Sequence, residues 1–152
     1  MSRPLLDLLT QEVSAVGEYI ELLDQEANAL SDSNFANLPV LAERKSTLAD
    51  HISGLGRRRD QEQLALGYPA GRAGTEAACA GAGPALAQAW ADLLTCATLA
   101  SSRNQRNGVM IHAHLDFTRQ TISFLQNSGQ PLYGPDGGHR PGTGGGSRLA
   151  RG

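Results

Sequence analysis

The chain has 152 residues, of which 15 are acidic and 13 basic, giving a formal net charge of −2 at pH 7. That length suffices for one domain. The near-balanced charge argues against a nucleic-acid-binding protein, which is usually strongly basic on one face. Nine of the 18 glycines lie in 127–152 and five in 67–83, so the remaining sequence contains few helix breakers. Because aromatic and β-branched residues are also too sparse for a β-rich domain, the sequence predicts an all-α protein.

The first predicted helix covers about residues 4–31 and begins near Pro4, a residue favoured in the first turn of a helix. Its apolar residues recur at alternating spacings of four and three from Leu9 to Leu30, which is the heptad pattern of a packed helix. Its acidic residues predict a solvent-facing outer side made of Glu12, Glu18, Glu21, Asp24 and Glu26.

The second predicted helix covers about residues 35–66, with Gly67 as the residue after its end. Lys45 occupies a position in its apolar seam, where it either selects the register of the helix pair or packs its stem while the ammonium reaches water. We favour the second interpretation. The arginines at 57–59 predict a solvated helix end, because no aromatic residues alternate with them to stack nucleic-acid bases.

The third predicted helix covers about residues 84–126 and follows a flexible Gly/Ala-rich linker, 67–83. Its seam is interrupted by Asn104, Asn107 and Gly108, which predict weak packing and permit a bend. At about 1.5 Å per residue this helix measures about 65 Å, whereas the two before it measure about 40 Å each. We therefore expect its second half to overrun the pair or to fold back at Gly108.

The predicted architecture is an antiparallel helical hairpin plus a long third helix, a three-helix bundle that resembles a coiled coil. This bundle domain covers residues 1–126. Residues 127–152 are rich in Gly and Pro, and such a composition cannot bury enough surface to offset the entropy of ordering. The sequence therefore predicts a disordered C-terminal tail.

Catalytic and metal-binding patterns are missing from the sequence. No glycine-rich phosphate loop with GK[ST] occurs. His112 and His114 point to different sides of a helix, and His112 with Asp116 supplies too few ligands for a metal. Cys79 and Cys96 match neither a disulfide framework nor a CxxC pair. With no secretory signal or membrane span, we expect a soluble cytosolic protein that is not an enzyme and has no cofactor, nucleic-acid partner or membrane insertion.

Several short motifs occur in a fixed order along the chain: the paired leucines Leu5-Leu6 and Leu8-Leu9, Lys45-Ser-Thr-Leu48, Asn104-Gln-Arg-Asn107-Gly108, Arg119-Gln120, and Leu132-Tyr133-Gly134-Pro135-Asp136-Gly137. In a chain of this size, the combination resembles the FlgN family of flagellar export chaperones. The resemblance covers nearly the whole chain except 67–83. It implies a chaperone that binds the C-terminal helical segments of hook-filament junction proteins (hook-associated proteins), prevents their premature assembly and delivers them to the flagellar type III export gate.

The excess length and the phenylalanines of the third helix suggest where such a client would bind. The predicted client-binding residues are Met110, Ile111, Leu115, Phe117, Ile122, Phe124 and Leu125. Two alternatives stay open, in which these residues close a bundle core or form a homodimer interface. Tyr133 is the candidate for docking to the export gate, because one aromatic side chain can anchor a transient contact; it equally fits a plain linker tyrosine. A competing hypothesis is a structural or adaptor coiled-coil protein with no client.

Overall fold

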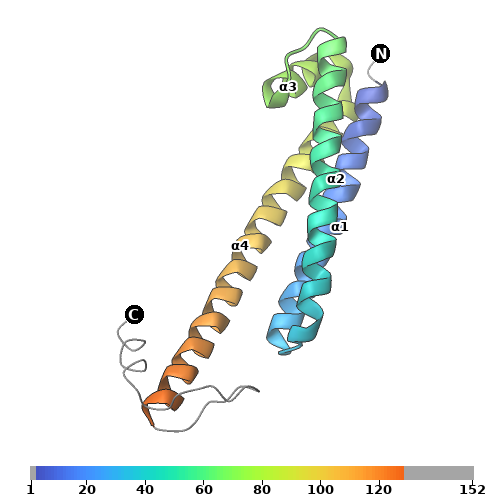
Figure 1. Cartoon of the computed structure of the whole chain (residues 1–152). Helices are drawn as coiled ribbons and strands as arrows, with labels where there is room; N and C mark the ends of the chain where they lie inside the picture. Colours follow the sequence, from blue (N-terminus) through green and yellow to red (C-terminus); the bar gives the residue numbers. More distant parts are fainter. Residues whose placement is uncertain (1–2, 129–152) are drawn as a thin grey trace. The chain divides into compact units, whose positions relative to one another are not determined.

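The computed structural model describes residues 3–128. The chain divides into two compact units, residues 1–108 and 109–152. The elements in chain order are α1 (Arg3–Ser31), the short 3-10 helix η1 (Phe35–Asn37), α2 (Leu38–Ala65), α3 (Gly71–Ala82) and α4 (Pro84–Asn127) (Figure 1). Residues 84–108 of α4 belong to the first unit and residues 109–127 to the second. The described residues contain no strand, and the all-α prediction is confirmed.

The first unit is built on the hairpin of α1 and α2, which lie side by side along their length in opposite directions (Figure 1). The turn between them is tight: Ser33 takes a positive φ of 58°, and the Asn34 amide donates to the Ala29 carbonyl at 2.8 Å. Leu8 and Ala15 of α1 bury against Leu55 of α2. Apolar residues at helical spacing thus make the predicted hairpin.

A larger core covers another side of α1. It joins apolar residues of α1, α3 and the first half of α4, with Tyr68 and Trp90 packed against it. Its buried members are Leu5, Leu9, Val16, Ile20, Ala78, Leu86 and Leu93. Because α1 contributes to both cores, it is the central helix of this unit.

The structure differs from the prediction of a flexible linker at 67–83, because α3 occupies most of that segment. Thr75 and Ala78 of α3 are buried, so packing outweighs the low helix propensity of the glycines. Gly74 allows the close approach: a Cβ there would overlap the Pro69 carbonyl oxygen and lie 2.7 Å from the Gln63 side-chain nitrogen. Gly67, with a positive φ of 92°, follows the end of α2 as predicted.

A first buried polar layer links α1, α2 and α3. Glu12, only 3% exposed, accepts a hydrogen bond at 2.6 Å from the Arg59 guanidinium. Arg59 also donates to the Thr75 hydroxyl at 2.9 Å and lies 5.5 Å from the centre of the Trp90 ring. Thr75 in turn donates to the buried amide of Gln63. The prediction that Glu12 and Arg59 face solvent was therefore wrong. Both side chains can be buried because the carboxylate and the guanidinium have opposite charges and are hydrogen-bonded to each other.

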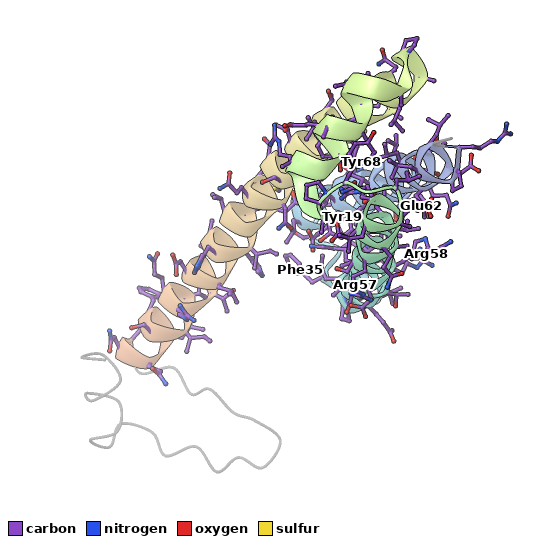
Figure 2. The ribbon with its side chains drawn as sticks, turned by 90° about the horizontal axis from the view of Figure 1, so that it is seen from above. Tyr19, Phe35, Arg57, Arg58, Glu62 and Tyr68 are labelled. Carbon is purple, nitrogen blue, oxygen red and sulfur yellow. The ribbon has the colours of Figure 1, made fainter. Side chains whose placement is uncertain are left out.

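The solvated helix end predicted at 57–59 is present only in part. Arg57 and Arg58, labelled on α2 in Figure 2, are exposed, whereas Arg59 is largely buried against Glu12. Consecutive residues point about 100° apart on a helix, so a run of three arginines cannot share one environment.

A second buried polar layer joins α1 and α2 to the first half of α4. Lys45 donates to both carboxylate oxygens of Glu26, at 3.1 and 3.3 Å. The buried Asn107 amide donates to Glu26 at 2.8 Å and to the Leu23 carbonyl at 2.7 Å. Three predictions are corrected here: Glu26 does not face solvent, the Lys45 ammonium binds a carboxylate, and Asn107 joins helices where weak packing was expected.

The two layers share one register. Glu12 and Glu26 are two heptads apart on α1, and Lys45 and Arg59 are two heptads apart on α2. Because the helices are antiparallel, one alignment of the hairpin brings both pairs together. A shift by one turn would leave four charged groups without partners near a core, so the layers specify the register of the hairpin.

Candidate functional site

The predicted client-binding residues all lie in the second unit, on residues 109–127 of α4. None of the described residues of this unit is buried. Phe117 is 67% exposed and Phe124 is 68% exposed. Leu115 and Ile122 are 44% and 43% exposed, values that are high for large apolar side chains. This segment therefore exposes several large apolar side chains.

The helix gathers these side chains on one side. Each residue advances about 100° around the axis, so the seven predicted residues fall within about half of the circumference. We call this surface the α4 apolar face. It consists of one heptad-spaced row, Met110, Phe117 and Phe124, and a second row, Ile111, Leu115, Ile122 and Leu125.

Apart from Val109 and Ala113, the other side of the same segment is polar. His112 and Ser123 lie there, and Asp116 forms an exposed ion pair with Arg119 at 3.6 Å. This contrast makes the segment an amphipathic helix, and such a helix can bind another protein through its apolar face.

The heptad pattern explains why the core residues of α4 stop before this segment. Leu86, Leu93 and Asn107 share one heptad position in residues 84–108 of α4. In residues 109–127 the same heptad position is occupied by His114 and Thr121. The large apolar residues of this segment therefore flank that heptad position and do not occupy it.

Sequence reasoning missed Val109, which is 69% exposed and lies outside the α4 apolar face. Its position next to Gly108, off the heptad spacing, gave no signal. Tyr133, the candidate for docking to the export gate, lies outside the described residues. The structure brings the seven candidates together on one helix; what they contact stays a prediction.

Other kinds of site find no support in the residues described. Within 3–128, no group of three or more His, Cys, Asp and Glu side chains could hold a metal ion. Cys79 and Cys96 are free thiols. The pKa of Cys79 is raised mainly by burial and to a smaller extent by the negative charge of the nearby Glu76. No helix in this part of the chain is long and apolar enough to cross a membrane.

Comparison with known proteins gives a consistent result. The family model described as "FlgN protein" matches residues 1–141. Two relatives are called "Flagella synthesis protein FlgN", one from Yersinia enterocolitica and one from its serotype O:8 / biotype 1B strain. Each is 38% identical over 55 residues, which are 36% of this chain and 37% of the relative. The alignments thus span little more than a third of those relatives. No solved structure matches.

Proposed function

The chain belongs to the FlgN family, and from this premise we propose that it is a cytoplasmic flagellar export chaperone without catalytic activity. Its clients are hook-filament junction proteins, whose C-terminal helical segments it binds through the α4 apolar face. Binding prevents premature assembly of the junction protein and precedes its delivery to the flagellar type III export gate. The names of the Yersinia relatives, which place those proteins in flagella synthesis, support the proposal.

The observation that carries the proposal is the exposure of the α4 apolar face. Two phenylalanines that are each about two-thirds exposed leave a large apolar area in water. Exposed large apolar side chains gathered on one half of a helix often mark an interaction site, and here the two rows flank His114, Thr118 and Thr121. An amphipathic client helix could cover both rows with its own apolar residues at heptad spacing. Shielding of the client's assembly surface would follow from the same contact.

The direct test is the variant Phe117→Ala/Phe124→Ala in the full chain. Loss of two aromatic anchors that become buried in the complex should weaken binding of a purified hook-filament junction protein by at least about 100-fold, since an anchor typically contributes about 2 kcal/mol or more and the two contributions do not simply add. Isothermal titration calorimetry measures the affinity, and far-UV circular dichroism measures the helix content.

Val109→Ala is the matched control, because Val109 is as exposed as the two phenylalanines but lies off the α4 apolar face. It should bind the junction protein with unchanged affinity. Unchanged binding by the double variant would contradict the proposed site. A collapse in helix content of the double variant would assign the phenylalanines to a core.

The homodimer alternative needs a separate measurement. If the α4 apolar face joins two copies of this chain, light scattering will show a dimer that Phe117→Ala/Phe124→Ala converts to monomer. If it serves a client, the junction protein and this chain will elute together as a stoichiometric complex. A stable elongated oligomer that takes up no junction protein would favour the adaptor hypothesis.

We further propose that Tyr133 docks the loaded chaperone to the export gate. The proposal is supported by the position of one aromatic residue in a Gly/Pro-rich segment and by the motif that resembles the family. Tyr133→Ala should reduce secretion of junction proteins by living cells while leaving their binding in solution unchanged. Normal secretion by a strain whose chain lacks residues 127–152 would refute it.

A further inference from the structure

A second surface lies in the first unit, in a groove on the hairpin. The groove has a volume of about 790 Å³ and is lined only by residues of α1 and α2. Its apolar lining residues are Leu22 of α1 together with Val40 and Leu48 of α2, which we call the floor. Val40 is 49% exposed. No residue of the α4 apolar face lines this groove, so it is a separate feature of the molecule.

Three glutamates also line the groove, and we call them its acidic rim. Glu18 and Glu21 line it from α1, and Glu43 lines it from α2. All three are exposed, and within residues 3–128 no hydrogen bond or ion pair engages their side chains. This distinguishes them from Glu12 and Glu26 on the same predicted acidic side, which are buried in ion pairs.

Positive charge at the groove does not balance these carboxylates. Arg44 and His51 also line it, and both are exposed. With three glutamates and one arginine, the lining stays net negative when His51 is neutral. Apolar floor and acidic rim therefore occur together, on a surface that α3 and α4 do not line.

We propose that this groove binds a helical peptide segment of another protein, with apolar residues on one face and lysine or arginine along its edges. The α2 lining runs from Val40 to His51, about three helical turns, which suits apolar anchors at i, i+3 or i+4, and i+7. Basic edge residues would meet Glu18, Glu21 and Glu43, while the anchors cover the floor. Charge complementarity selects this class of partner over an acidic or neutral helix.

This inference does not rest on the proposed function, because the groove and the α4 apolar face share no residue. A chain that binds no junction protein could still bind a basic helix here. The variant Phe117→Ala/Phe124→Ala separates the two, since it should leave binding at the groove unchanged.

The test uses two labelled synthetic 14-residue helical peptides with leucines along one face. One carries lysines on its edges and the other carries glutamates at the same positions. Fluorescence anisotropy measures their binding to the full chain. The lysine peptide should bind at least about tenfold more tightly than the glutamate peptide, and Glu18→Gln/Glu21→Gln/Glu43→Gln should abolish that difference.

The matched control is Asp7→Asn/Asp32→Asn/Asp50→Asn, which removes the same number of charges from exposed positions outside the groove lining. It should change the affinity for the lysine peptide by less than twofold. Equal weakening by both triple variants would show attraction to overall charge and overturn the proposal. Absence of binding, or equal binding of the two peptides, would also overturn it. A dimer that Val40→Asp dissociates would instead assign the groove to a second copy of this chain.

Discussion

The buried pair of Glu12 and Arg59 provides a quantitative test of the first polar layer. Side-chain exposure is 4% for Glu12 and 14% for Arg59, and their closest atoms are 2.6 Å apart. Glu12→Ala leaves the Arg59 guanidinium largely buried without its anion, and breaking a buried pair in this way costs about 3–5 kcal/mol. A domain of this size is typically stable by only about 5–15 kcal/mol. The variant should therefore lose a large part of its stability.

Urea denaturation measures this loss in the first unit through the fluorescence of Trp90, the single tryptophan of the chain. With an m-value of about 2 kcal/mol per M, the midpoint should fall by about 2 M. Circular dichroism, recorded in parallel, guards against a change in the Trp90 signal caused by Arg59, which lies over its ring. The double variant Glu12→Leu/Arg59→Met should regain much of the loss, because it removes both charges together.

The control is Glu76→Gln, which breaks the ion pair of Glu76 with Arg72. Those side chains are 50% and 68% exposed, and an exposed pair contributes only about 0–1 kcal/mol. The midpoint should therefore move by less than about 0.5 M. If Glu12→Ala destabilises no more than Glu76→Gln, the argument from burial is refuted.

Three further predictions concern other parts of the first unit. Gly74→Ala should unfold α3 from the hairpin, because the added Cβ would overlap the Pro69 carbonyl oxygen. Hydrogen exchange should then become faster only in residues 71–82, and an unchanged exchange rate there would contradict the prediction. Asn107→Ala removes the hydrogen bonds to Glu26 and to the Leu23 carbonyl and should lower the free energy of unfolding by about 1–3 kcal/mol. Hydrogen exchange should become faster in residues 84–108. An unchanged urea midpoint would contradict the stabilising role of the second buried polar layer. Cys79 should be alkylated more slowly at pH 8 than an unperturbed thiol, because its raised pKa lowers the thiolate fraction; rapid alkylation would disprove this.

Heptad spacing was enough to predict the all-α fold and the hairpin. The apolar residues of α1 from Leu9 to Leu23 recur on one side of the helix, and that side is buried or half-buried in the structure. Local spacing determines which side of a helix is apolar, so this part of the fold follows from the sequence alone.

Residues whose environment depends on distant partners could not be predicted in this way. Glu12 and Glu26 resemble Glu18 and Glu21 in sequence, yet the first two are buried with cations of α2 that lie far along the chain. α3 was missed for a similar reason, because its glycine-rich sequence lowers helix propensity and only packing compensates.

The two candidate sites differ in the same respect, namely whether they depend on one helix or on the packing of two. The seven residues of the α4 apolar face were predictable, because their grouping follows from the periodicity of a single helix. The groove on the hairpin was not, because Leu22 and Val40 belong to different helices and their neighbourhood depends on the register that the buried pairs specify.

One titration tests directly whether the α4 apolar face binds the C-terminal helical segment of a hook-filament junction protein, as we propose. Purified full-length chain is titrated with a purified junction protein, for the parent sequence and for Phe117→Ala/Phe124→Ala. We expect a saturable stoichiometric complex for the parent and at least about 100-fold weaker binding for the variant at unchanged helix content. Equal affinities for the two proteins, or no complex with the parent, would contradict it.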